Sequence, residues 1–284
     1  MRALAIAAVF FAGCGPGDPP PSPPPAPAQA LAPARIVSLS PSATEVVAAL
    51  GAVPQLVGVD TYSKFPAEVA QVAKVGDYLH PNAETILQMR PTLVIADDVH
   101  ADLAHVLSDA HARVASCPIH TLADVKTCLG TVGAALGRPD VAATVVAQID
   151  TDVAAARRAA PPSHPRVLLV IDRDADGLAN LVAAGPGSYV DELLAVVGGA
   201  NVLAASALPY PKVSVEDILR AQPQVILDLS FAARASTTPW DALDIPAAHD
   251  HRVVAITDET LLAPSPRVAQ ALGTLLRALA QPAR

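Results

Sequence analysis

The chain has 284 residues, of which 52% are hydrophobic and 3% aromatic, which is enough for two domains of ordinary size. Acidic residues outnumber lysines and arginines by 27 to 19, and the formal net charge is −8. The sequence lacks a basic run that could neutralise phosphates, so it argues against nucleic-acid binding. It also lacks an apolar stretch of roughly 18–20 residues, the length needed to span a bilayer.

Residues 1–13 are typical of a secretory signal peptide. Arg2 supplies a positive charge, and the apolar run from Ala3 to Ala12 is too short to span a membrane. The small residues before Cys14 resemble a bacterial lipobox, in which the cysteine is lipidated and becomes the mature N-terminus. We therefore expect Cys14 to carry lipid. The alternative is an ordinary signal with an incidental cysteine.

Residues 14–33 are predicted to form a disordered tether. The stretch "GPGDPPPSPPPAPAQALAPA" is rich in proline and cannot form a core. Such a segment stays extended, at about 3.1 Å per residue, and acts as a semi-rigid spacer. We expect an exported protein whose lipid anchor holds it to the cell membrane, facing the periplasm or the cell exterior.

Two parts of the remaining chain repeat one pattern of expected elements. Each begins with a strand, "RIVSLS" from Arg35 and "RVLLVI" from Arg166, and a helix that ends near a glycine follows. Each then has a short helix carrying an acid, Glu84 or Glu216, before a buried strand. Alternating strands and helices favour parallel sheets covered by helices, and two copies favour two similar lobes.

A long helix is expected between the two copies. Pro139 suits a first helical turn, apolar residues recur at helical spacing up to Val153, and two prolines from Pro161 end the pattern. About 20 helical residues span about 30 Å. The predicted fold is α/β, with two Rossmann-like lobes joined by a single rigid helix. The expected bounds are 34–136 for the first lobe, 137–160 for the helix and 161–284 for the second lobe.

Two cysteines lie in the predicted first lobe. Cys117 follows a strand-like run and Cys128 lies in a helix-like run. Export makes a disulfide between them possible. Two separate buried thiols are the alternative.

Several ordered blocks of the sequence resemble one family, the substrate-binding proteins of ABC importers for cobalamin, ferric siderophores and haem. The resemblance covers the chain from about Ala34 to its end and is closest to the cobalamin-binding members. The blocks that carry it are "RIVSLSPSATEVVAALGAVPQLVGVDTYSKFPAEV", "VGDYLHPNAETILQMRPTLVIAD", "GPGSYVDELLAVVGGANV" and "VSVEDILRAQPQVI".

The resemblance gives the repeated acids a role. In this family each lobe presents a glutamate that meets arginines on one of the two membrane subunits, and Glu84 and Glu216 match these positions. The implied partners are an ABC permease dimer and its ATPase. The alternative is that both are first-turn glutamates favoured by the helix dipole.

The family also places a small-molecule ligand between the lobes, on loops at the carboxyl ends of the parallel strands. Tyr62, Tyr78 and Tyr210 lie in such loops, and their flat rings suit a wide planar ligand such as a corrin. Asp97 and Glu259 are expected as polar neighbours. The alternative for each tyrosine is packing on its own lobe.

The identity of the ligand stays open, because several residues expected in the cleft depart from the family pattern. Asp97 stands where the cobalamin binder has a tryptophan, Ala263 where an arginine is expected, and Glu259 where an aspartate is expected. Haem binders have a tyrosine one residue before Tyr78. We expect a corrinoid, with haem or a ferric siderophore as the alternative, and no separate cofactor.

Other functions have weaker support. His100, His105 and His111 do not share a metal-binding face, and "HDH" from His249 reads as a polar turn, so we expect no metal site. The sequence has neither a G-x-G-x-x-G loop nor a catalytic triad with supporting context, so we expect no enzyme activity. A lipoprotein that senses or hands on its ligand without an importer is a further alternative.

Overall fold

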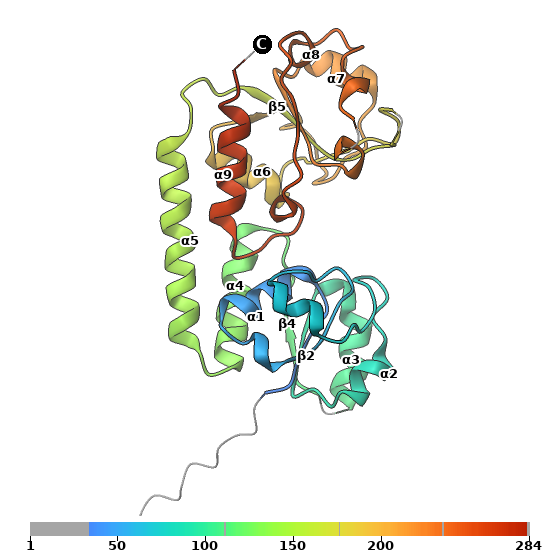
Figure 1. The fold of residues 1–284 in the computed structure, drawn as a ribbon, viewed down its shortest axis with the longest axis vertical. Coiled ribbons are helices and arrows are strands. Elements are labelled where there is room, and N and C mark those ends of the chain that lie inside the picture. The colour runs from blue at the N-terminus through green and yellow to red at the C-terminus, as the bar shows by residue number, and fades with distance from the viewer. Residues whose placement is uncertain (1–33, 111, 176, 235, 283–284) are drawn as a thin grey trace, which may run out of the picture. The chain divides into compact units, whose positions relative to one another are not determined.

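The structure is a computed structural model, which describes residues 34–110, 112–175, 177–234 and 236–282 (Figure 1). Pro33–Arg284 form one compact unit. The predicted signal peptide, the tether and the lipidated Cys14 lie outside the described residues and stay predictions. None of the helices in the described ranges combines the length and the apolar character needed to cross a membrane.

The first lobe is built on a sheet of four parallel strands in the order β2-β1-β3-β4. The strands are short and almost wholly buried, as expected of a parallel sheet covered by helices. The strands are β1 (Ile36–Ser38), β2 (Leu56–Val59), β3 (Leu93–Ala96) and β4 (Val114–Ser116). The helices are α1 (Pro41–Ala49), η1 (Val53–Gln55), η2 (Ala67–Gln71), α2 (Ala83–Gln88), η3 (Asp98–His100), α3 (Ala101–Asp109) and α4 (Leu122–Ala135).

The second lobe repeats this arrangement, with β5 flanked by β7 and β8 and with β9 beyond β8, all parallel. The strands are β5 (Arg166–Asp172), β6 (Val182–Ala183), β7 (Ala200–Asn201), β8 (Val225–Asp228) and β9 (Val253–Ala255). The helices are α6 (Tyr189–Val196), α7 (Val215–Ala221), η4 (Phe231–Arg234), η5 (Thr238–Trp240), α8 (Pro246–His249), η6 (Glu259–Leu261) and α9 (Val268–Leu279). The predicted fold class, two α/β lobes with parallel strands, is confirmed.

One strand departs from the parallel expectation. The two-residue β6 pairs antiparallel with β5. Only residues 173–181 separate the two strands, and a parallel return needs a crossover of about a dozen residues or more. The short connection therefore fixes the direction of β6.

A 21-residue helix, α5 (Pro139–Ala159), lies in the sequence between the two sheets and packs against α4 and α9 (Figure 1). Pro139 begins it, and Arg157 and Arg158 in its last turn complement the helix dipole. Every described strand of the first sheet precedes α5, and every described strand of the second follows it. That α5 is the single rigid link between the lobes stays a prediction.

The apolar core continues from one lobe into the other beside α5. One cluster of buried side chains includes Leu129 of α4, Ile149 of α5, Leu193 of α6 and Leu275 of α9. In the first lobe, Cys117, directly after β4, is joined by a disulfide to Cys128 in α4, with their Cα atoms 5.2 Å apart. Of the two alternatives for the cysteines, the structure shows the disulfide.

Candidate functional site

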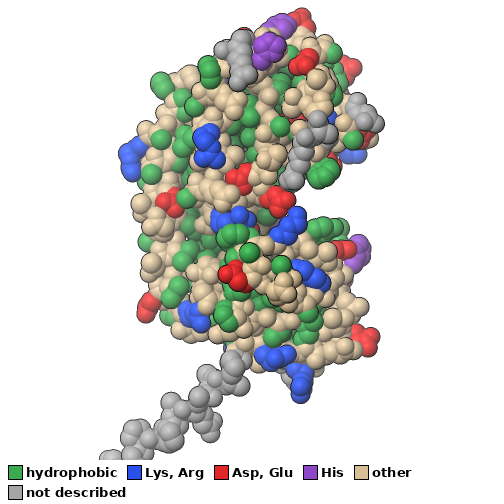
Figure 2. All heavy atoms as spheres, in the orientation of Figure 1, with side chains coloured by type: hydrophobic (Ala, Val, Ile, Leu, Met, Phe, Trp, Pro, Cys, Tyr) green, Lys and Arg blue, Asp and Glu red, His purple; other side chains and the backbone are tan. Residues whose placement is uncertain are grey.

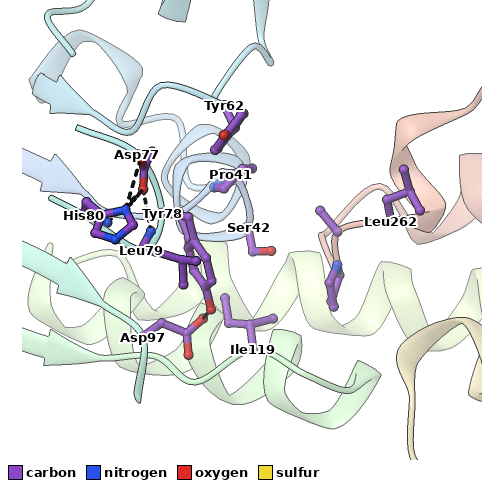
Figure 3. Close-up of a pocket in the computed structure, with 13 residues that line it drawn as sticks. Pro41, Ser42, Tyr62, Asp77, Tyr78, Leu79, His80, Asp97, Ile119 and Leu262 are labelled. Carbon is purple, nitrogen blue, oxygen red and sulfur yellow. Dashed lines mark hydrogen bonds and ion pairs between the residues drawn. The ribbon is translucent and has the colours of Figure 1, made fainter. Parts of the chain in front are cut away.

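A cavity of about 610 Å³ lies between loops of the two lobes (Figure 3). Its size falls within the range of about 300–1,000 Å³ that is usual for small-molecule sites. Figure 2 shows the surface hollowed on the side away from α5. The lining residues are Ser40, Pro41, Ser42, Tyr62, Asp77, Tyr78, Leu79, His80, Asp97 and Ile119 from the first lobe, and Leu262, Ala263 and Pro264 from the second.

A second cavity of about 430 Å³ adjoins the first. The two share Pro41, Tyr62, Leu262 and Ala263, so together they form one cleft. The second cavity carries more charge, because Glu45, Lys64, Glu259 and Arg267 line it together with Phe65 and Phe231.

The structure brings three of the five predicted ligand residues together. Tyr62, Tyr78 and Asp97 line the first cavity, and Glu259 lines the second. Tyr210 lines a separate hollow of about 300 Å³, which shares Leu262 and Pro264 with the first cavity. Tyr210 thus borders a hollow that adjoins the first cavity, and that all three tyrosines face one ligand cleft stays a prediction.

Tyr62 is presented to the cleft by an anchored loop. Its backbone N–H donates to Asp60 Oδ2 at 2.8 Å, and Lys74 Nζ donates to the backbone oxygens of Asp60 and Ser63. Burial raises the pKa of the Asp60 carboxyl, although the hydrogen bonds from Ser63 and Tyr62 and the charge of Lys74 oppose that shift. These hydrogen bonds anchor the loop, while Tyr62 itself stays 58% exposed.

Tyr78 is held by two residues that follow β3. Its hydroxyl donates to Asp97 Oδ2 at 3.1 Å (Figure 3). The ring of His100 packs edge-on against it, with the ring centres 5.3 Å apart. Burial and the charge of Asp97 raise the pKa of the Tyr78 hydroxyl above its ordinary value of about 10, so it keeps its proton at neutral pH.

His100 joins the two loops through one defined tautomer. The backbone N–H of Asp97 donates to His100 Nδ1 at 3.0 Å, so the ring proton must lie on Nε2. Nε2 in turn donates to the carbonyl oxygen of Tyr78 at 2.6 Å. The sequence analysis considered His100 only as a metal ligand and missed this role. The available signal was its spacing of three residues from Asp97, which is the spacing of a capping box.

Two ion pairs connect the lobes across the second cavity. Arg267, just before α9, donates through Nε and an η nitrogen to both carboxylate oxygens of Glu45 in α1, and its guanidinium lies 4.0 Å from the ring centre of Phe65. Lys64 Nζ lies 3.3 Å from Glu259 Oε1. Glu259, predicted as a ligand neighbour, therefore already pairs with a lysine of the opposite lobe.

The two repeated glutamates occupy equivalent places. Glu84 is the second residue of α2, and Glu216 is the second residue of α7. Each helix has a side-chain N-cap and leads into the strand beside the first strand of its sheet. Both glutamates are exposed, and neither lines the two cleft cavities. This placement suits contact with another protein, and the first-turn dipole effect applies to both as well.

Comparisons with known proteins agree with this architecture. The vitamin B12-binding protein of Vibrio cholerae is 27% identical over 244 residues, covering 84% of this chain and 86% of that protein. YvrC of Bacillus subtilis, named as an uncharacterized ABC transporter substrate-binding lipoprotein, is 26% identical over an alignment of 304 residues, covering 98% of this chain and 95% of that protein.

A solved structure is similar over most of the chain. The periplasmic haem-binding protein RhuT from Roseiflexus sp. RS-1, in its apo form, has a TM-score of 0.78 at 30% identity and covers 87% of this chain and 98% of that chain. The family described as "Periplasmic binding protein" matches residues 36–239, which is more than half of the sequence. The chain therefore belongs to the periplasmic binding protein family, whose members here include vitamin B12-binding, haem-binding and ABC transporter substrate-binding proteins.

Proposed function

We propose that this periplasmic binding protein captures a corrinoid of the cobalamin type in the cleft and delivers it to an ABC permease. The observation that carries the proposal is the first cavity, where Tyr62 and Tyr78 offer aromatic surface beside apolar Ile119 and Leu262. A corrin is wide, flat and largely apolar on its faces, and aromatic side chains provide large contact areas for such a surface. The relative named as a vitamin B12-binding protein supports the same ligand class.

Haem is the second candidate, and two observations favour it. The similar structure of RhuT is that of a haem-binding protein. In addition, Tyr62 and His80 line the first cavity with exposed side chains, and tyrosine and histidine are both known ligands of haem iron. A corrinoid does not need a protein side chain to coordinate its metal. The two candidates therefore differ in whether the loss of His80 weakens binding.

Calorimetric titration of the full chain separates the candidates. Cobalamin, cobinamide, haem and a ferric siderophore would be titrated under identical conditions. The proposal expects saturable one-to-one binding of at least one corrinoid, tighter than that of haem or the siderophore. Binding of haem alone, abolished by His80→Ala or Tyr62→Phe, would replace the corrinoid assignment with haem. Heat is a better signal than tryptophan fluorescence, because Trp240, the only tryptophan in the sequence, is buried in the second lobe.

For delivery, we propose that the exposed glutamates, Glu84 and Glu216, dock to the permease. One acid in each of two similar lobes suits a partner with twofold symmetry. Glu84 and Glu216 meet this requirement, since they lie at equivalent positions on α2 and α7. The partners proposed are therefore an ABC permease dimer and its ATPase, with no nucleic acid.

The same proposal includes a lipid anchor at Cys14 and no catalytic step. YvrC, which aligns over 98% of this chain, is named as a lipoprotein, which supports anchoring. Mass spectrometry of the membrane-extracted protein should show lipid on Cys14, and Cys14→Ser should release the protein in soluble form. Incubation with bound ligand should return the ligand chemically unchanged, and any turnover would contradict the assignment as a binding protein.

A further inference from the structure

Three potential metal ligands converge beside Tyr78. Asp97, Asp98 and His120 each offer one donor atom, and these atoms all lie within 4.8 Å of one another. His120 Nε2 lies 3.0 Å from Asp98 Oδ2 and 3.8 Å from Asp97 Oδ1. The two aspartates are adjacent, but His120 lies 22 residues after Asp98, so no sequence motif reveals the group.

The fold brings these residues together for a simple reason. Asp97 and Asp98 directly follow β3, and His120 lies shortly after β4, the parallel neighbour of β3. Carboxyl ends of neighbouring parallel strands meet at the same edge of a sheet. The loop that carries His120 is held at one end by the disulfide at Cys117, and its backbone N–H at position 120 donates to Asp124 Oδ2 at 3.1 Å.

Asp97 has less basic charge beside it than the other buried carboxylates have. The other buried carboxylates in the described part of the chain each have a basic neighbour: Glu45 has Arg267, Asp60 has Lys74 and Asp228 has Arg173. The Asp97 side chain is only 4% exposed, yet its sole described cationic neighbour is His120. Burial of a carboxylate without a full counter-charge is costly.

We propose that Asp97, Asp98 and His120 bind a divalent transition-metal ion such as zinc at the wall of the cleft. Imidazole nitrogen and carboxylate oxygen are both ordinary zinc ligands, and three protein ligands leave a coordination position for water. Asp97 Oδ2 accepts the Tyr78 hydroxyl, and Oδ1 accepts the backbone N–H of Asp98 at 2.8 Å, so Oδ1 would offer its second lone pair to the metal. The ion would thus share one carboxylate with the aromatic wall of the first cavity. This inference does not depend on which ligand the cleft binds.

Direct metal titration tests the proposal. The full chain, prepared without a histidine tag and freed of metal with a chelator, would be titrated with Zn²⁺ by calorimetry and with Co²⁺ by visible absorption. We expect one strong site per chain and a Co²⁺ spectrum typical of nitrogen and oxygen ligands. His120→Ala and Asp98→Asn should each weaken binding by about tenfold or more, since even outer-shell partners of metal ligands affect affinity by about 10–100-fold.

Matched controls make the result decisive. His105→Ala removes an exposed histidine outside the group and should leave the strong site unchanged. The side chains of His120 and Asp98 are 53% and 58% exposed, so their substitution should not disturb folding, which circular dichroism checks. If a variant fails to fold, the Co²⁺ spectrum of the other decides. The absence of a strong site in the wild type, or equal binding by wild type and both variants, would overturn the proposal.

Discussion

The Tyr78 hydroxyl donates a hydrogen bond to Asp97 Oδ2 at 3.1 Å, which ties an aromatic ring of the cleft to a buried carboxylate at the end of β3. The two residues belong to different loops of the first lobe. Their contact fixes the ring against the wall of the first cavity, and the ring of His100 packs edge-on against it. A wall held in this way is ordered before a ligand arrives, which reduces the entropic cost of binding.

Loss of either aromatic ring in the first cavity should weaken ligand binding. Tyr62→Ala and Tyr78→Ala each remove contact area from the cavity wall, and truncation of a well-packed aromatic commonly costs about 2 kcal/mol, or about thirtyfold in affinity. Calorimetry with the best-binding corrinoid measures the effect. Val106→Ala, an exposed apolar substitution on α3 away from the cleft, should leave affinity unchanged. Unchanged affinity in both tyrosine variants would remove the ligand from this cavity.

His100→Ala should weaken ligand binding through Tyr78 and also destabilise the fold. It removes one buried and one partly buried hydrogen bond, each contributing about 1 kcal/mol, so the free energy of unfolding should fall by about 2 kcal/mol. Urea denaturation measures this loss. The effects of His100→Ala and Tyr78→Ala on affinity should be less than additive, because both act on one ring. Full additivity in the double-mutant cycle would contradict a positioning role for His100.

Reversal of the repeated acids should impair transport and leave ligand binding intact. Glu84→Lys and Glu216→Lys change exposed residues, which contribute little to the stability of the free protein. At an interface with basic permease residues they would place like charges together, which is costly. Uptake of radiolabelled ligand by cells should fall more in the lysine variants than in Glu84→Ala and Glu216→Ala, and most in the double lysine variant. Wild-type uptake by that double variant would rule out docking through these acids.

Because of His120, the free energy of unfolding should fall as the pH rises. Burial acts to lower the pKa of His120, but the hydrogen bond to Asp98 and the charges of Asp97, Asp98 and Asp124 outweigh it and raise the pKa above its ordinary value of 6.5. The folded state therefore holds this proton more tightly than the unfolded state. The resulting stabilisation is present below the ordinary pKa and is lost as the pH rises through the raised value.

Urea denaturation between about pH 6 and about pH 8, with a chelator present, measures this dependence. The free energy of unfolding should decline more in the wild type than in His120→Gln, by less than about 1 kcal/mol because the side chain is 53% exposed. An identical pH dependence in both proteins would show that His120 does not couple its charge to folding.

Much of the fold could be predicted from local sequence patterns. The run from Pro139 to Ala159 has a proline at its start, helical spacing of apolar residues and two basic residues at its end, and α5 has these bounds. The repeated strands and helices likewise follow from apolar runs separated by turn residues, and both sheets show them. The direction of β6 was missed, because it depends on the length of a connection rather than on the residues of the strand.

The cleft was less accessible to prediction, since its residues meet only in three dimensions. Tyr62 and Tyr78 were singled out because aromatic residues in loops stand out in this sequence, and Asp97 because of its position relative to the resembled family; all three line the first cavity. The pair between Glu45 and Arg267 joins residues 222 positions apart, and the sequence offers no signal for it. Tyr210 was grouped with the other tyrosines from its loop alone, and it lines a hollow that adjoins the first cavity at Leu262 and Pro264.

The central proposal is that the first cavity, lined by Tyr62 and Tyr78, binds a corrinoid. Calorimetric titration of cobalamin into the full chain, beside the Tyr62→Ala/Tyr78→Ala double variant, tests it most directly. The account predicts saturable one-to-one binding by the wild type and a loss of affinity of roughly a thousandfold in the double variant, because two aromatic contacts at about 2 kcal/mol each are removed. No cobalamin binding by the wild type, or equal binding by the double variant, would contradict it.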